Sequence, residues 1–196
     1  MKILRIDASA RYQGSVSREL TDELIDRLKQ QDPHVEVITR DLLKGIPLLD
    51  EAMVRAYNTP DEERTPEQKE LLSVSENLIA ELKSADQIVI GVPIYNFSVP
   101  AALKAYIDLV CRAGLTFTYS SEGPKGLLKD RKTYLIVTSG GTPVGSDIDF
   151  TTGYLKHVLG FIGIQDVEII AADSLGRTGS EKLSQVRKQL QTMTIS

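Results

Sequence analysis

A short apolar run near the middle of the chain restricts the possible folds more than any other segment. Residues 88–92 read IVIGV, a run rich in β-branched side chains and free of charge, which is typical of a strand buried on both faces of a sheet. Pro93 has no backbone N–H group and is expected to end the pairing. Helical spacing begins after Pro100, in residues Leu103, Tyr106, Ile107 and Val110. A strand that leads through a loop into a helix indicates an open α/β sheet, which binds ligands where its strands end.

The rest of the chain repeats this alternation. Further strands are expected at residues 2–7, 35–38, 133–138 and 167–171. Further helices are expected from Ser15 or Ser17 to residue 31, from Thr65 to Lys83, and at residues 149–161 and 180–192, with a weaker one at 52–57. Residues 113–128 are rich in Gly, Ser and Thr and are expected to form a hairpin-like excursion over a site. The alternation predicts a single α/β domain over residues 1–196, a doubly wound three-layer sandwich around a five-stranded parallel sheet.

Charge and composition exclude several classes of partner. The formal charge of −4 and the pI near 5.3 argue against nucleic acid, because phosphate binding needs concentrated Lys and Arg. No apolar run approaches the roughly 20 residues that span a bilayer, so no membrane partner is expected. The N-terminus reaches Asp7 too early to provide a signal-peptide core. The single cysteine, Cys111, cannot form an internal disulfide, which favours a cytoplasmic location.

Three loops that follow strands share one chemistry. The first offers hydroxyls at Ser9, Ser15 and Ser17, the second contains residues 95–98 (YNFS), and the third contains residues 139–142 (SGGT). Hydroxyls and free N–H groups at a helix start favour an anion, and paired glycines let the backbone approach a flat ligand. Taken singly, the serines are more often helix caps, the glycines a turn and the aromatic residues packing. Together they favour a phosphate in the first loop and an aromatic ring system between the other two.

The sequence lacks the motifs that several other kinds of ligand-binding or catalytic site require. The first loop has neither the dinucleotide fingerprint G-x-G-x-x-G nor a P-loop, and the chain has no G-x-S-x-G elbow. Cys111 is expected well inside the central helix, where a core role is favoured over a reactive one. His34 and His157 have no partners at zinc-ligand spacing, so no metal is expected. Pro93 occupies the position where a receiver domain has its phosphorylated Asp. Because no catalytic side chain stands out, the chemistry is expected to come from a bound cofactor.

Several segments resemble the FMN-dependent NADH-azoreductase family. They are residues 93–97 (PIYNF), 103–108 (LKAYID), 113–117 (AGLTF), 138–141 (TSGG) and 159–164 (LGFIGI). The resemblance spans nearly the whole chain, and the first of these segments is its most specific motif. Two positions depart from commoner members, because Ile94 stands in place of the usual Met and Gly140 in place of a frequently larger or charged residue.

The resemblance implies a flavodoxin-like fold with strand order 2-1-3-4-5 and a homodimer with two FMN sites near the subunit interface. It implies that the FMN phosphate is held by Ser9, Ser15, Val16 and Ser17. The isoalloxazine ring would be contacted by Pro93, Ile94, Tyr95, Asn96 and Phe97, mainly through backbone N–H groups, and bordered by Ser139, Gly140, Gly141 and Thr142. Tyr119 and Phe161 resemble aromatic residues that cover the open flavin face, where nicotinamide and substrate alternate.

The implied activity is a two-step exchange. NADH, or NADPH, transfers a hydride to FMN and leaves, and a quinone or aromatic azo compound then takes two electrons, with azo cleavage to amines as the final result. Detoxification is the implied setting. Two alternative hypotheses remain: an NADPH-preferring flavin or chromate reductase, and a non-enzymatic flavodoxin-like electron carrier. Arg55 and Arg64 lie in a poorly patterned segment, and we favour the interpretation that both are solvated rather than directed into the site.

Overall fold

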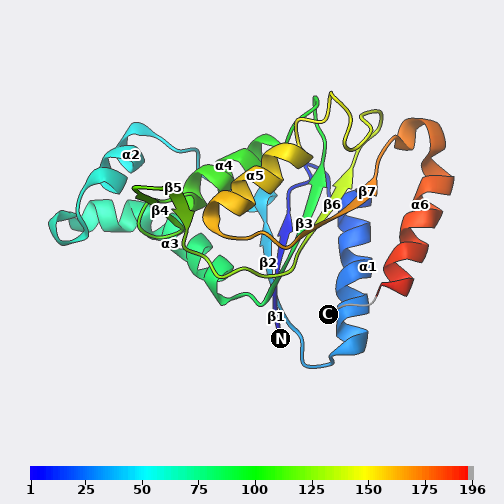
Figure 1. Ribbon diagram of the computed structural model, residues 1–196, viewed down its shortest axis with the longest axis horizontal. Coiled ribbons are helices and arrows are strands. Elements are labelled where there is room, and N and C mark those ends of the chain that lie inside the picture. Colours follow the sequence, from blue (N-terminus) through cyan, green and yellow to red (C-terminus); the bar gives the residue numbers. More distant parts are fainter. Residues whose placement is uncertain (194–196) are drawn as a thin grey trace.

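Five parallel strands form the centre of the computed structural model, which describes residues 1–193 (Figure 1). Their order is β2-β1-β3-β6-β7, for β1 (Lys2–Asp7), β2 (Glu36–Asp41), β3 (Gln87–Pro93), β6 (Thr133–Thr138) and β7 (Val167–Ala172). The expected order 2-1-3-4-5 is the same topology, because β4 (Phe117–Ser120) and β5 (Gly123–Gly126) pair with each other outside this sheet. The expected hairpin in residues 113–128 is therefore present.

Helices cover both faces of the sheet (Figure 1). One face carries α1 (Val16–Gln31) and α6 (Leu175–Thr192), and the other carries α3 (Pro66–Ser84), α4 (Ala101–Val110) and α5 (Thr152–Ile162). The segment between β2 and α3 contains η1 (Leu42–Lys44), α2 (Glu51–Asn58) and η2 (Asp61–Glu63). No helix within residues 1–193 has the combination of length and apolar character needed to cross a bilayer.

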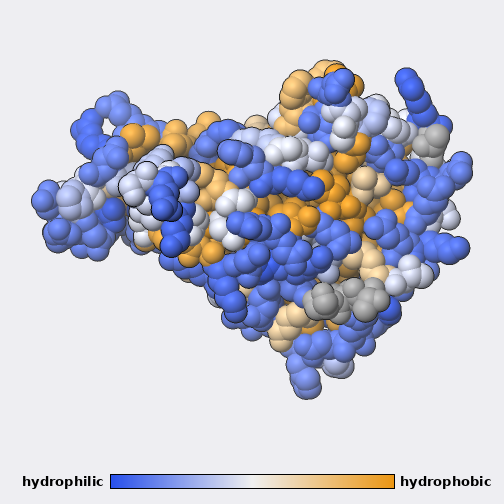
Figure 2. Space-filling view, viewed as in Figure 1, coloured by the Kyte–Doolittle hydropathy of each residue, from blue (hydrophilic) through white to orange (hydrophobic). Residues whose placement is uncertain are grey.

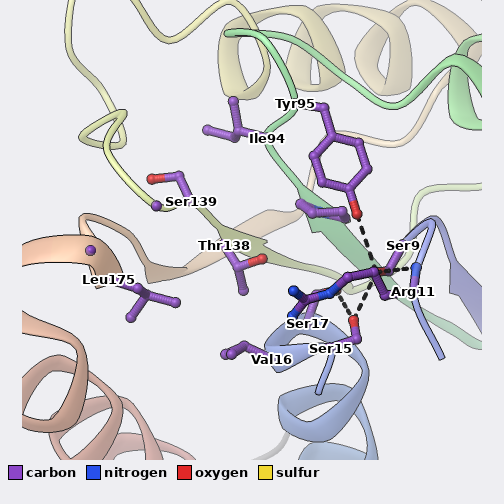
Figure 3. Close-up of a pocket in the computed structure, with 13 residues that line it drawn as sticks. Ser9, Arg11, Ser15, Val16, Ser17, Ile94, Tyr95, Thr138, Ser139 and Leu175 are labelled. Carbon is purple, nitrogen blue, oxygen red and sulfur yellow. Dashed lines mark hydrogen bonds between the residues drawn. The ribbon is translucent and has the colours of Figure 1, made fainter. Parts of the chain in front are cut away.

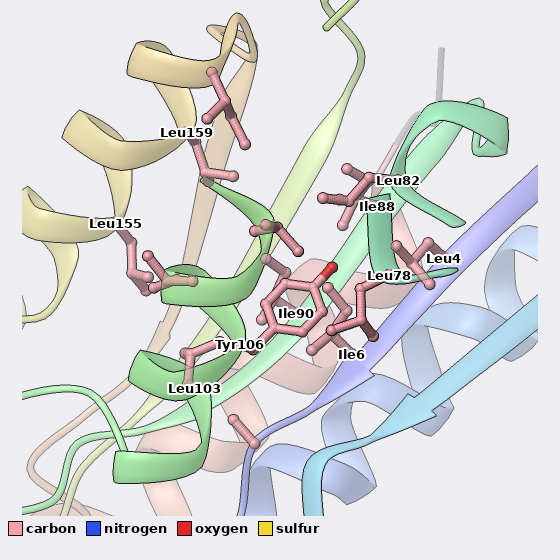
Figure 4. Close-up of a cluster of buried hydrophobic side chains, with 14 of the residues drawn as sticks. Leu4, Ile6, Leu78, Leu82, Ile88, Ile90, Leu103, Tyr106, Leu155 and Leu159 are labelled. Atoms are coloured by element: carbon pink, nitrogen blue, oxygen red, sulfur yellow. The ribbon is translucent and has the colours of Figure 1, made fainter. Parts of the chain in front are cut away.

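Alternate residues of each strand enter two separate cores. In β1, Ile3 packs on the α1 and α6 side, whereas Leu4 and Ile6 pack on the other side, as the two-residue period of a strand requires. All seven residues of β3 are buried, because this strand lies at the middle of the sheet. Figure 4 shows the larger core, where the ring of Tyr106 from α4 lies among aliphatic side chains of β1, β3 and α3.

The central strand continues one residue further than expected. Pro93 is the last residue of β3 and is paired with Thr138. It is tolerated because β1 pairs with β3 only as far as Gly91, with a last hydrogen bond from Ala8 N to Gly91 O. The backbone N–H and C=O groups of odd-numbered residues in β3 point toward β1. An N–H at position 93 would therefore point beyond the end of β1, where no strand residue pairs with it. On the other side, Ile94 N still donates to Thr138 O at 2.7 Å.

Helix boundaries confirm most expectations, but the start of α6 and the end of α4 differ from them. The capping box of α3 is complete, because Thr65 and Gln68 exchange backbone and side-chain hydrogen bonds of 3.0 and 3.3 Å. By contrast, α6 begins at Leu175, five residues before the expected start at residue 180. The local sequence contains two glycines and argues against a helix. The first turn is instead held by contacts with the loop after β6, described below.

Candidate cofactor-binding site

The loops after β1, β3 and β6 meet at the carboxyl edge of the sheet, together with the start of α6, around a cavity of about 410 Å³ (Figure 3). This volume lies within the range of small-molecule and cofactor sites. Nine of the expected cofactor-binding residues line the cavity: Ser9, Ser15, Val16, Ser17, Pro93, Ile94, Tyr95, Ser139 and Gly140. Asn96, Phe97, Gly141 and Thr142 belong to the same loops but do not line it.

Three buried serine hydroxyls lie at the N-terminus of α1. Ser15 Oγ donates to Ser9 Oγ at 2.8 Å and is 3.3 Å from Ser17 Oγ, and each of the three residues is at most 4 % exposed. Ser15 occupies the N-cap position but its side chain accepts no hydrogen bond from the helix. The first N–H groups of α1 therefore remain available to a ligand, and the helix dipole favours an anion there.

A tight turn follows β3 and brings Tyr95 against the first loop. Tyr95 N donates to Ser98 O and Ser98 N donates to Tyr95 O, at 3.0 and 3.1 Å. Both central residues have left-handed backbones, with φ of 49° at Asn96 and 70° at Phe97. The Tyr95 hydroxyl accepts from Ala10 N at 3.2 Å and is 3.4 Å from Ser9 Oγ. Figure 3 shows this phenol pointing from the second loop to the first.

The third wall of the cavity is held by the start of α6. Leu175 N donates to Ser139 O at 3.0 Å, and Gly176 N donates to Gly140 O at 2.8 Å. Ser139 Oγ donates to Thr142 O and accepts from Ser174 N. A Cβ atom at Gly176 would lie 2.9 Å from Gly140 O, so glycine permits the close approach of the helix to this loop.

Asp173 ties the same loop to α6 by charge. Its carboxylate accepts from Val144 N at 2.8 Å and lies 2.9 Å from Lys182 Nζ. Burial alone would raise the pKa of Asp173, but the ammonium of Lys182 and the N–H of Val144 outweigh it and hold this pKa below its usual value. The carboxylate is therefore ionised at neutral pH and restrains the loop after β6.

Four further residues line the cavity that the sequence did not single out: Arg11, Thr138, Leu175 and Gly176. Arg11 follows Ser9 in the first loop, and its guanidinium donates to Gly14 O. The sequence could have indicated Arg11 as a site residue, because it is a cation in a loop that also offers hydroxyl groups. Leu175 and Gly176 gave no such signal, because only the tertiary contact with Ser139 and Gly140 places them here.

The two aromatic residues expected over the open flavin face lie outside this cavity. Phe161, on α5, packs against Phe117 with ring centroids 4.4 Å apart, and Phe117 contacts Tyr119 at 5.5 Å. Tyr119 is 72 % exposed. Figure 1 shows the β4–β5 hairpin, which carries Phe117 and Tyr119, away from the loops that form the cavity.

Cys111 was expected inside the central helix, but it is the residue that caps the C-terminus of α4. The position follows from backbone geometry, because α4 ends at Val110 before the turn that leads to Thr116. Burial raises the pKa of the Cys111 thiol to about 11, so the thiol is protonated at neutral pH and is a poor nucleophile. Within residues 1–193, no group of three His, Cys, Asp or Glu residues is arranged to hold a metal ion.

The two arginines of the segment between β2 and α3 differ from each other. Arg55 pairs with Glu51 one turn away, and its side chain is 72 % exposed, as the solvated interpretation predicts. That interpretation is wrong for Arg64, whose side chain is 12 % exposed because its Nε donates to Ala56 O and its Nη1 binds Asp61. Neither side chain lines the cavity.

A family model described as a flavodoxin-like fold matches residues 1–193. An FMN-dependent NADH:quinone oxidoreductase 1 of Jannaschia sp. (strain CCS1) is 57 % identical over 88 % of each chain. The protein of the same name in Colwellia psychrerythraea (strain 34H / ATCC BAA-681) is 52 % identical over 97 % of this chain and 99 % of its own.

Solved structures agree with these sequence relatives. An FMN-dependent NADH-azoreductase from Bacillus anthracis str. Ames Ancestor, solved in complex with FMN, superposes with a TM-score of 0.87 at 28 % identity, over 97 % of this chain and 96 % of its own. An azoreductase from Bacillus anthracis str. Sterne gives 0.86 at 26 % identity, over 98 % and 99 %. This chain therefore belongs to the FMN-dependent NADH-azoreductase family, within the flavodoxin-like fold.

Proposed function

We propose that this protein is a cytoplasmic FMN-dependent NADH:quinone oxidoreductase that also cleaves aromatic azo compounds. The observation that carries the proposal is the uncapped N-terminus of α1, where three buried serine hydroxyls face a cavity bounded by two further loops. A phosphate monoester fits this end of the cavity, because hydroxyls, N–H groups and the Arg11 guanidinium are all donors. The names of the sequence relatives support FMN as the bearer of that phosphate.

The residues of the cavity would divide the work of holding FMN. Ser9, Ser15 and Ser17, with the first N–H groups of α1, would bind the phosphate. The loop from Ile94 to Phe97 and the loop from Ser139 to Thr142 would lie along the ring system, offering backbone N–H groups to its polar edge. When bound, FMN supplies the transfer of two electrons from NADH to a quinone or azo acceptor, which is chemistry that no side chain in the cavity provides.

A second copy of the chain would complete the site. Tyr119 and Phe161 lie outside the cavity of their own chain, yet they are the aromatic residues expected over the flavin. Tyr154, Val158 and Phe161 are partly exposed apolar residues spaced along one stripe of α5. Figure 2 shows apolar side chains gathered near the middle of the molecule, beside α5. We propose that this surface forms a homodimer in which the aromatic pair of one copy covers the FMN of the other.

An absorption spectrum of the purified protein tests the cofactor. Bound FMN gives bands in the visible region, and NADH should bleach them in the absence of oxygen and restore turnover of a quinone. Protein that carries no flavin and gains neither binding nor NADH oxidation when FMN is added would contradict the proposal. Rates with NADPH well above those with NADH would favour the alternative reductase class. A stable one-electron state on photoreduction would favour the electron carrier.

Mixed dimers test whether the site is shared. Ser17→Trp, which blocks phosphate binding, and Phe161→Ala, which removes the aromatic cover, should each have low activity alone. Mixing equal amounts of the two variants after reversible dissociation should restore about a quarter of wild-type activity per active site, because about half of the dimers are then mixed and one of the two sites in each mixed dimer is intact. A mixture no more active than its components would show that both residues act within one copy, and a monomer in sedimentation would reject the dimer.

A further inference from the structure

Arg18 binds the backbone of the first loop but does not itself line the cavity. It is the third residue of α1, and its side chain is 12 % exposed. Its Nε donates to Arg11 O at 2.9 Å, and its Nη2 donates to Ser9 O at 3.0 Å. One guanidinium therefore binds two backbone carbonyls of the loop that is expected to receive the phosphate.

The guanidinium is itself fixed by the sheet. Its Nη2 donates to Asp41 Oδ1 at 2.8 Å, and its Nη1 lies 3.4 Å from Asp7 Oδ2. Asp7 ends β1 and Asp41 ends β2, so both carboxylates belong to neighbouring strands. The ring of Tyr12 lies 4.9 Å from the guanidinium carbon and covers it. These contacts give Arg18 one orientation, which its planar, five-donor fork can satisfy and a lysine cannot.

The orientation of the Ser9 carbonyl determines what the loop presents to the cavity. In a trans peptide, the carbonyl of one residue and the N–H of the next point in opposite directions. Because Arg18 binds Ser9 O, the N–H of Ala10 is directed the other way, where it donates to the Tyr95 hydroxyl at 3.2 Å. The clamp thus turns two carbonyl oxygens away from the site of an anion and connects the first loop to the second.

We propose that Arg18 is a positioning residue for the FMN phosphate, which it serves by fixing the loop of Ser9 and Arg11 rather than by touching the ligand. The inference rests on the proposed binding of FMN. Without the clamp, the Ser9 and Arg11 carbonyls are free to rotate toward the phosphate, and the serine hydroxyls lose their common direction. The loss concerns the phosphate alone, because the ring is held by the other two loops.

The test compares FMN with riboflavin, which has the same ring system and no phosphate. In Arg18→Lys the charge remains, so the field at the phosphate is kept and only the planar fork is lost. We expect the Kd of the apoprotein for FMN to rise about tenfold, which is comparable to the loss of one hydrogen bond made by a charged group. The Kd for riboflavin should stay within about twofold. A purely structural role of Arg18 would weaken the binding of both ligands equally.

Two further variants complete the design. Arg187→Lys is the control. Arg187, on α6, pairs with Glu19 and Glu23 of α1, the helix that also carries Arg18, and among the described residues it has no hydrogen bond or ion pair with the first loop. Asp41→Asn removes one anchor of Arg18 from outside the loop, and it should lower the FMN preference in the same direction if Arg18→Lys does not fold. A ratio of the FMN and riboflavin Kd values that is unchanged in both Arg18→Lys and Asp41→Asn would overturn the inference. Wild-type protein that binds no FMN would instead reject the proposed function.

Discussion

The backbone of Phe97 is strained, and its largely exposed side chain gains little burial to offset that strain. Left-handed φ values at both central residues are typical of a hairpin turn whose second position prefers glycine, but Phe97 stands there with φ of 70° and is 52 % exposed. Such a conformation costs an L-residue about 1–2 kcal/mol, and retained strain of this kind is frequent at functional sites.

Replacing Phe97 by glycine should separate stability from function. In Phe97→Gly we expect the free energy of unfolding of the apoprotein to rise by about 0.5–1 kcal/mol, the relief of strain less the added entropy of the unfolded chain, while quinone turnover falls. Urea denaturation and steady-state rates measure the two effects. A lower unfolding free energy would show that the ring contributes packing that outweighs the strain.

The same geometry decides how Asn96 can be probed. A proline at position 96 would delete the N–H group expected near the flavin, but proline fixes φ near −65° and Asn96 has φ of 49°. Asn96→Pro would therefore change the backbone conformation of the whole turn, and its effect could not be assigned to the lost N–H group alone. Asn96→Gly is the informative change, because it keeps both the N–H and the left-handed backbone and removes only the amide side chain.

Tyr106 carries a buried hydroxyl that, within residues 1–193, has no hydrogen-bond partner. The residue is 4 % exposed, and Figure 4 shows the oxygen pointing among Leu78 and Ile88. An unsatisfied buried hydroxyl costs about 1–3 kcal/mol. We expect Tyr106→Phe to raise the unfolding free energy by about 1 kcal/mol, whereas Tyr106→Leu, which removes the ring, should lower it. Thermal denaturation of the three proteins measures this, and a destabilised Phe variant would reveal a partner for the hydroxyl.

Among the elements, the β4–β5 hairpin is attached through two glycines. A Cβ at Gly126 would lie 2.2 Å from Gly163 N, and one at Gly163 would lie 2.5 Å from Leu128 O. Leu128 N also donates to Ile162 O at 3.0 Å. The backbone of the hairpin therefore rests directly on the C-terminal turn of α5, and that contact sets where Tyr119 stands.

Gly126→Ala should displace the hairpin and leave the cavity intact. If Tyr119 and Phe161 cover the flavin of a second copy, quinone turnover should fall by up to about a hundredfold, the effect that a misplacement of about 1 Å can produce. The Kd for FMN should change little. Gly153→Ala is the control, since a Cβ at that position of α5 meets nothing within 4 Å. Turnover equal to that of the control would contradict a role for the hairpin.

The elements also show what the sequence could and could not predict. Strand β3, the capping box of α3 and the three loops were predictable, because each rests on local chemistry: β-branched burial, a Thr-Pro start, and hydroxyls after a strand. The early start of α6 was not, because Gly176 is a poor helix former whose N–H is satisfied by Gly140 O, far away in the sequence. Arg64 was misjudged for a different reason, because its partner, the carbonyl of Ala56, is only eight residues away but is a backbone group that no side-chain pattern reveals.

For the molecule as a whole, acid should loosen one side of the cavity first. Asp173 binds Val144 N and Lys182, while Asp149 binds the N–H groups of Gly145 and Thr152. Burial opposes ionisation in both cases, but these partners prevail and lower the pKa of each carboxyl. A lowered folded-state pKa gives stability that is fully present above the unfolded value of about 3.9 and is lost as pH falls through the folded value.

The contribution of Asp173 can be isolated by pH. Between about pH 5 and pH 3, spanning the unfolded value, the urea midpoint of the wild-type protein should fall. In Asp173→Asn it should fall less, because that carboxylate is no longer available to be protonated. Asp26→Asn is the matched control, because Asp26 lies on the exposed face of α1 and makes no hydrogen bond or ion pair with any residue in 1–193. Parallel pH curves for wild type and Asp173→Asn would contradict this linkage.

The two hydrogen bonds from Leu175 and Gly176 to the loop after β6 have a consequence for how long the cofactor stays bound. They make an edge helix part of the cavity wall, so each transient detachment of α6 from the sheet also releases Ser139 and Gly140. The residence time of FMN is then limited by the opening frequency of α6, and amide hydrogen exchange in these two segments should rise and fall together. A protein domain fused after α6 would disturb this helix, and we expect faster dissociation of the cofactor to be its first measurable effect.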